Sequence, residues 1–132
     1  MLKPYLLKNG VTHIDIAFVT HMDSDHSKGV EQLSQIMKID TLVLPVCERL
    51  EENSIKADNI IYAYEGLHIE AGGAVFDVIS PPKSGGFGDK NNDCIVMRTE
   101  VDGVSILFTG DLAGDGEQRL LNDPKIACDV IK

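Results

Sequence analysis

An apolar segment at residues 14–20 leads directly into the sequence His21-Met22-Asp23-Ser24-Asp25-His26. The segment is short and rich in residues that favour β-structure, which is typical of a buried strand. Four of the six residues that follow it are histidine or aspartate. A strand end followed by a tight turn holds such side chains firmly and leaves them open on one side. The pattern therefore predicts a metal site at the end of a buried strand.

The side chains of this cluster indicate the cation and the chemistry. Mixed imidazole and carboxylate ligands suit zinc, manganese or iron, and no thiolate is present to favour zinc alone. A pair of such metals activates water and clamps the oxygens of a phosphoryl group, so the expected chemistry is hydrolytic. The simpler alternative is a group of polar loop residues, in which Asp25 caps the helix that follows.

A second candidate ligand lies in Thr109-Gly110-Asp111, which ends an apolar strand later in the chain. The glycine permits a close approach of the backbone, and the carboxylate after it is placed to bridge two metals. Alone, Gly-Asp after a strand fits an ordinary turn equally well. Beside the first cluster it favours a bridging ligand.

Strands and helices are expected to mix along the chain. Apolar spacing predicts a helix from Ser27, with Val30, Leu33, Ile36 and Met37 on one face. Asp102-Gly103 is a strong signal for a two-residue hairpin. Further helices are expected over residues 2–10 and 116–121, and a helix with loops over 46–59. Strands are expected over 14–20, 41–44, 60–64, 67–69, 74–79, 94–101, 104–109 and 128–131, and a loop over 81–92. This order predicts an α/β (α+β) fold.

Length and composition exclude several classes of protein. The 132 residues suit a single domain over 1–132. The net charge of −9, without a run of Lys or Arg, argues against a nonspecific nucleic-acid or membrane binder but suits a site for cations. The three cysteines, Cys47, Cys94 and Cys128, form no CxxC pair and are expected to be small buried hydrophobes. No apolar run approaches the roughly 20 residues of a membrane helix.

The two clusters together resemble a known family. Thr20 to His26 resembles the His-x-His/Asp-x-Asp-His motif of the metallo-β-lactamase superfamily, and Thr109-Gly110-Asp111 resembles its Thr-Gly-Asp motif. The resemblance is strongest to the hydrolase domain of the ComEC proteins of DNA uptake, which also carry Asp at the position of Asp23. It implies a metallo-β-lactamase-type αββα sandwich.

The resemblance also implies a ligand set. His21 and Asp23 would hold one divalent metal, zinc or manganese, and Asp25 and His26 would hold a second. Asp111 would bridge the two, and Asp25 would orient the nucleophilic water. Asn92 would line the substrate site; Cys94 replaces a Ser of the family and is assigned no role.

Two motifs of the family have no counterpart here: an upstream Asp-x-Gly-x-Gly-Asp-like motif and a downstream His-His-Gly-Ser-like motif. We therefore expect a partial sandwich, part of a larger membrane protein, that binds metal weakly and turns over little by itself. The expected function is a phosphodiesterase or nuclease acting on DNA during competence-related uptake. Its partners would be DNA and the rest of the parent protein, without direct membrane contact from this chain.

The location implied by the resemblance is the extracytoplasmic side of the cell membrane, with the cytoplasm as the alternative. Two other functions stay open. One is a stand-alone metallo-hydrolase of small esters, lactones or nucleotides, and the other is a non-catalytic metal-binding module. His13 and His68 are expected to be surface or structural residues rather than ligands.

Overall fold

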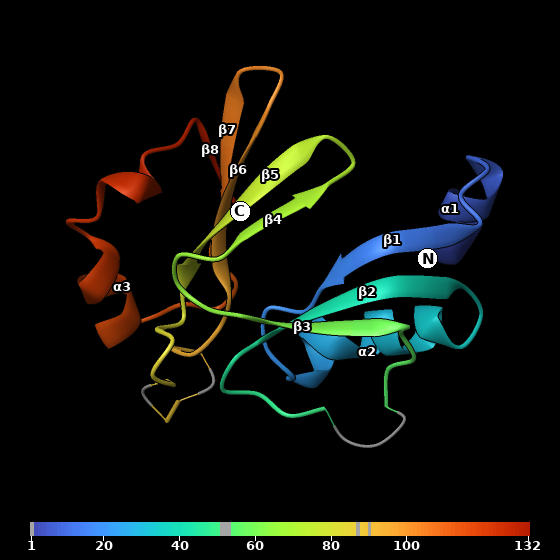
Figure 1. The fold of residues 1–132 in the computed structure, drawn as a ribbon, viewed down its shortest axis with the longest axis horizontal. Coiled ribbons are helices and arrows are strands. Elements are labelled where there is room, and N and C mark those ends of the chain that lie inside the picture. Colours follow the sequence, from blue (N-terminus) through green and yellow to red (C-terminus); the bar gives the residue numbers. More distant parts are fainter. Residues whose placement is uncertain (1, 51–53, 87, 90) are drawn as a thin grey trace.

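The computed structural model describes residues 2–50, 54–86, 88–89 and 91–132. Its elements are α1 (Leu2–Lys8), β1 (His13–Phe18), α2 (Ser24–Ser34), β2 (Lys38–Pro45), β3 (Asn59–Ala63), β4 (His68–Ala71), β5 (Ala74–Ser80), β6 (Val96–Val101), β7 (Val104–Phe108), α3 (Asp115–Leu120), the 3₁₀ helix η1 (Pro124–Ile126) and β8 (Val130–Ile131). The strands form two sheets, in the orders β1-β2-β3 and β4-β5-β6-β7-β8 (Figure 1). This mixed architecture confirms the α/β (α+β) class. No helix in the described ranges has the length and apolarity needed to span a membrane.

Three apolar clusters define the layers of the molecule. One joins the two sheets and contains Val43 and Ala63 of the first sheet with Val78 and Met97 of the second. A second covers the other face of the first sheet and packs against Val30 of α2. The third lies between the second sheet and α3, where Leu120 is buried. The layers therefore run helix, sheet, sheet, helix, with α2 on one outer side and α3 on the other (Figure 1).

The first sheet is parallel, and its central strand is apolar on both faces. Val43 of β2 belongs to the cluster between the sheets, whereas Leu42 and Leu44 belong to the cluster on the α2 side. A central parallel strand with both faces covered tends to be a continuous apolar run, and residues 42–45 of β2 form such a run. Because β1, α2 and β2 form a strand–helix–strand unit with β1 and β2 parallel, the carboxyl end of β1 lies at the same sheet edge as that of β2. Ligands of open α/β sheets collect at such an edge.

The second sheet contains a hairpin, β6 with β7, whose turn the sequence predicts. Asp102 and Gly103 have φ values of 51° and 79°, and Val101 pairs with Val104 across them. These are the positive φ values of a two-residue hairpin turn, so that prediction is confirmed. Among the described strand pairs of this sheet, β7 with β8 is parallel and the others are antiparallel.

The helix expected over residues 46–59 is wrong wherever the structure describes that segment; residues 51–53 lie outside the described residues. The strand β2 continues through Pro45, and the chain then turns. Ile55 is buried, the Lys56 amide donates to Ser34 Oγ, and the Asp58 amide donates to the Ile39 carbonyl. These tertiary contacts satisfy the backbone without a helix.

Two boundaries also differ from expectation. The helix α2 ends at Ser34, so Ile36 is left 49% exposed, while Met37 still packs inward and is 6% exposed. The strand β6 begins at Val96 rather than at Cys94, although Cys94 and Ile95 are fully buried. Met37, Cys94 and Ile95 are thus buried as the apolar pattern predicts, although they lie outside the helix and the strand, whereas Ile36 is not buried.

Hydrogen bonds between Asp129 and Ser105 connect the start of β8 to β7. The Asp129 carboxylate accepts hydrogen bonds from the Ser105 amide (2.9 Å) and hydroxyl (2.7 Å), which lower the pKa of Asp129. A group with a lowered folded pKa stabilises the fold above its ordinary pKa and loses that effect as pH falls through the folded value. We expect Asp129→Asn to speed hydrogen exchange at the Ser105 and Lys132 amides at neutral pH, and to remove this part of the acid sensitivity. Asp102→Asn, at the exposed hairpin tip, is the control; unchanged exchange in Asp129→Asn would contradict the assignment.

Candidate metal centre

The cluster His21 to His26 begins where the first sheet meets the second. Beyond the end of β1, the Val19 amide still donates to the Val43 carbonyl of β2 (3.0 Å). One residue later the Thr20 carbonyl accepts from the Ile95 amide, just before β6 (2.8 Å). The chain is therefore held by both sheets immediately before His21, which is only 1% exposed.

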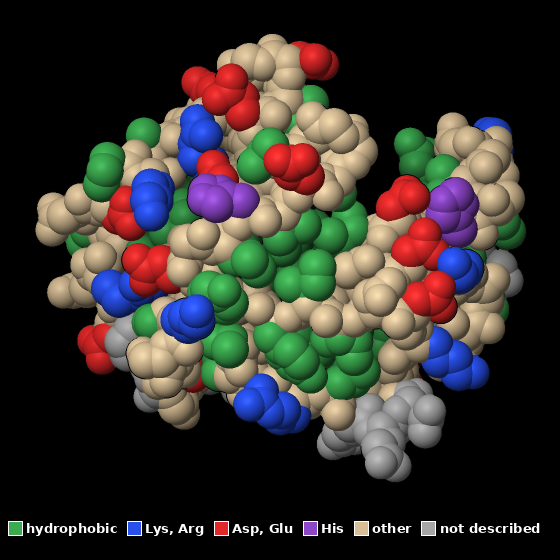
Figure 2. Space-filling model, viewed as in Figure 1, with side chains coloured by type: hydrophobic (Ala, Val, Ile, Leu, Met, Phe, Trp, Pro, Cys, Tyr) green, Lys and Arg blue, Asp and Glu red, His purple; other side chains and the backbone are tan. Residues whose placement is uncertain are grey.

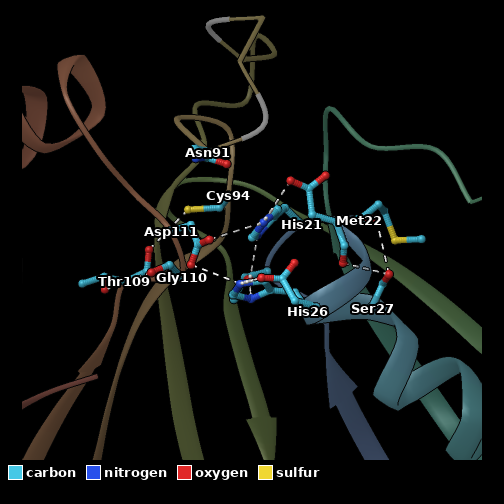
Figure 3. A network of polar contacts seen from close by, with 12 residues as sticks. His21, Met22, His26, Ser27, Asn91, Cys94, Thr109, Gly110 and Asp111 are labelled. Atoms are coloured by element: carbon cyan, nitrogen blue, oxygen red, sulfur yellow. Dashed lines mark hydrogen bonds and ion pairs between the residues drawn. The ribbon is translucent and has the colours of Figure 1, made fainter.

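Asp111 arrives at the same place from the second sheet. The turn after β7 brings its carboxylate to the two imidazoles, as Figure 3 shows. Oδ1 of Asp111 lies 3.1 Å from His26 Nε2, and Oδ2 lies 3.9 Å from His21 Nε2. His21, His26 and Asp111 each offer one ligand atom, and these atoms all lie within 4.8 Å of one another. Each carboxylate oxygen of Asp111 thus faces a different histidine.

The other two aspartates each stand beside one histidine. Asp23 Oδ2 lies 3.7 Å from His21 Nε2, and Asp25 Oδ2 lies 3.6 Å from His26 Nε2. The residues therefore form two half-sites, His21 with Asp23 and His26 with Asp25, and Asp111 spans both. This is the grouping that the family resemblance implies.

The residues fit a pair of divalent cations. His21 Nε2 is buried and has no hydrogen-bond partner among the described residues. A buried polar atom left unsatisfied costs about 1–3 kcal/mol, so such an atom calls for a ligand. Three carboxylates around two imidazoles also repel one another unless positive charge lies between them. The aspartate side chains are 42% (Asp23), 75% (Asp25) and 44% (Asp111) exposed, so the cluster opens to solvent on one side.

Helix capping does not account for the aspartates. Asp23, not Asp25, occupies the N-cap position of α2, and its side chain makes no capping hydrogen bond. Asp25 lies inside the first helical turn. The Ser27 hydroxyl instead donates to the Asp23 carbonyl at 3.0 Å. The capping alternative for Asp25 is therefore wrong.

Close packing positions the turn that carries Asp111. Gly110 has a φ of 56°, and a Cβ atom added there would lie 3.1 Å from both Cys94 Sγ and Thr20 Cβ. The Cys94 thiol donates to the Thr109 carbonyl (3.3 Å), and burial raises the pKa of this thiol to about 11. Cys94 is therefore a protonated packing residue at neutral pH, not a thiolate ligand.

Asn92 makes structural hydrogen bonds. Its Oδ1 accepts from the Gly116 amide (3.1 Å) at the start of α3, and its Nδ2 donates to Asp89 Oδ2 (3.1 Å). These bonds tie the 81–92 loop to α3. The substrate-lining role predicted for Asn92 draws no support from them.

The remaining histidines lie on the surface, as expected. His13 Nε2 lies 3.2 Å from Asp15 Oδ1, and His68 Nδ1 lies 2.5 Å from Asp77 Oδ1. The group His13, Asp15 and Asp40 could bring ligand atoms together. However, the Lys38 ammonium already donates to Asp40 (2.6 Å) and lowers the pKa of that carboxyl. We therefore interpret Asp40 as the partner of Lys38 in a surface ion pair and not as a metal ligand.

Sequence reasoning missed two contributors to the centre. The Thr20 hydroxyl lies within hydrogen-bond distance of both histidine rings. The Glu48 carboxylate accepts from the Met22 amide (3.4 Å) and so supports the turn between the ligands. Thr20 could have been suspected from its place directly before His21, whereas nothing in the sequence connects Glu48 with Met22.

Comparison with known proteins gives one relative. No sequence profile of a known family matches the chain. Along its whole length the chain is similar to ComE operon protein 3 of Bacillus subtilis (strain 168), with 33% identity over 141 aligned residues. The chain spans 18% of the length of that protein.

The packing at Gly110 yields a matched pair of substitutions. Gly110→Ala and Gly103→Ala both place a Cβ at positive φ, so each should lower the free energy of unfolding by about 1–2 kcal/mol. Only the Cβ at Gly110 meets neighbours, whereas nothing lies within 4 Å at Gly103. We expect Gly110→Ala alone to displace Asp111 and to weaken zinc binding by roughly tenfold or more. Chemical denaturation and zinc titration measure the two effects; equal zinc affinity in both variants would contradict this account.

Proposed function

We propose that the chain is the two-metal hydrolase domain of a DNA-processing protein, with a metallo-β-lactamase-type sandwich fold. The observation that carries the proposal is the position of Asp111, whose two oxygens face two different histidines, each with its own aspartate. The helix–sheet–sheet–helix layering supports the fold. The similarity to ComE operon protein 3 supports a role in competence and DNA uptake.

The side chains divide the work of such a centre. His21 and Asp23 would hold one cation, His26 and Asp25 the other, and Asp111 would fix their separation. When bound, the two cations supply Lewis acidity and activate water as a nucleophile. Asp25 is the most exposed of the three carboxylates, so it can accept a proton or orient water at the open side of the cluster.

The proposed substrate is the phosphodiester backbone of DNA. A chain with net charge −9 attracts nucleic acid poorly by its side chains alone, so phosphate affinity would come chiefly from the bound cations. Because the chain spans 18% of its relative, the rest of a longer protein would guide the strand to the centre. We place this domain on the extracytoplasmic side of the membrane, with the cytoplasm as the alternative. Transmembrane segments in the complete gene product would favour the DNA-processing function, and their absence would favour a stand-alone hydrolase of small esters, lactones or nucleotides.

Substitution of Asp25 tests the hydrolytic role. Asp25→Asn keeps the size of the side chain but removes a base, so hydrolysis of single- and double-stranded DNA should fall about 10²–10⁴-fold. The assay uses zinc or manganese, with this chain and with the complete gene product. Asp77→Asn is the matched control because Asp77 is a half-exposed carboxylate paired with His68, outside the centre.

Three results distinguish the possible functions. Metal-dependent cleavage of DNA that Asp25→Asn loses and Asp77→Asn keeps would support the proposal. Cleavage of small esters, lactones or nucleotides without cleavage of DNA would overturn the substrate. Stoichiometric metal binding without hydrolysis in the complete gene product would identify a non-catalytic metal-binding module.

A further inference from the structure

Thr20 stands between the two histidines of the centre. Its Oγ1 lies 3.2 Å from His21 Nδ1 and 3.3 Å from His26 Nδ1. The two rings lie side by side, with centroids 4.2 Å apart and planes inclined by 41° (Figure 3). The single hydroxyl oxygen of Thr20 is thus within hydrogen-bond distance of the Nδ1 atom of each ring.

This contact decides which nitrogen each ring presents to the carboxylates. With both Nδ1 atoms turned toward Thr20, both Nε2 atoms face Asp111. A hydroxyl oxygen has two lone pairs and can accept from two N–H groups at once. If both rings carry their proton on Nδ1, both Nε2 atoms are free to bind a cation. A partner on the remote nitrogen is the usual means of fixing a ligating histidine in this tautomer.

The hydroxyl is itself held in place. The Thr20 carbonyl accepts a hydrogen bond from the Ile95 amide at 2.8 Å, and this bond fixes the backbone between the two sheets. On the other side Gly110 approaches so closely that an added Cβ would lie 3.1 Å from Thr20 Cβ. Side chains that position others need such support, because a loose oxygen could not orient two rings.

We propose that Thr20 is a positioning residue shared by both half-sites, its single hydroxyl orienting both imidazoles for metal. The proposal rests on the two-metal centre proposed above and adds a specific coupling to it. If each histidine had its own partner, loss of one partner would weaken one half-site. A shared oxygen predicts that a single substitution weakens both.

Two substitutions of Thr20 separate the hydroxyl from the shape of the side chain. Thr20→Val keeps the branched shape and removes the oxygen, whereas Thr20→Ser keeps the oxygen and removes the methyl group. Zinc titration of Thr20→Val should show affinity reduced about 10–100-fold in both binding steps. Thr20→Ser should remain within a few-fold of the wild-type protein. Hydrogen exchange at the Ile95 amide, whose acceptor is the Thr20 carbonyl, checks that the backbone is intact.

A second measurement does not depend on metal. Long-range ¹H–¹⁵N NMR spectra of the metal-free protein report which ring nitrogen carries the proton. We expect His21 and His26 both to carry it on Nδ1 in the wild-type protein and in Thr20→Ser, and both to lose this preference in Thr20→Val. His68, paired with Asp77, is an internal reference that should not change.

The outcomes separate this inference from the proposed function. Weakening of a single zinc-binding step in Thr20→Val, or a tautomer change in a single ring, would overturn the sharing. Unchanged zinc affinity and unchanged tautomers would overturn the positioning role and leave the two-metal centre standing. If the wild-type protein takes up no zinc, the proposed function fails, and the tautomers of the two rings still decide whether Thr20 orients them.

Discussion

The contact between the two sheets is the constraint on which the candidate centre depends. The histidines follow a strand of the first sheet, and Asp111 follows a strand of the second, so the two half-sites meet only while the sheets keep their spacing. Apolar side chains of both sheets, among them Val43 and Val78, fill the layer between them. The hydrogen bond from the Ile95 amide to the Thr20 carbonyl then fixes the two edges against each other at the site itself.

A glycine, Gly110, allows the close packing of the two sheets beside the candidate centre. Gly110 lets the turn before Asp111 lie directly on Thr20 and Cys94, where a side chain would collide. Precision of a metal centre comes from such supporting contacts as much as from the ligands. Next to Asp111 the supporting groups are the Thr20 hydroxyl, the buried Cys94 thiol and Gly110. None of the three carries charge at neutral pH, so they position the ligands without competing for a cation.

Much of this arrangement could be predicted because its signals are local. The strand before His21, the apolar stripe of α2 and the Asp102-Gly103 turn all depend on neighbours within a few residues. The prediction of a helix at 46–59 is wrong because backbone amides of this segment donate hydrogen bonds to Ser34 and Ile39, and no local pattern reveals these partners. Asn92 and Thr20 show the same limit at the site: which amide or ring each side chain meets depends on how the two sheets close.

The positions of the ligands along the chain have a consequence for folding. His21 to His26 lie within one strand–helix turn and can adopt their arrangement through local contacts, whereas Asp111 must cross most of the chain to reach them. Contacts between residues far apart in sequence form late, because the conformational entropy of the intervening chain is lost before the contact contributes favourable free energy. We therefore expect the Asp111 carboxylate to join the two histidines last. A ligand that binds all three groups together stabilises only the fully assembled two-sheet state, so its binding and the completion of the fold are linked.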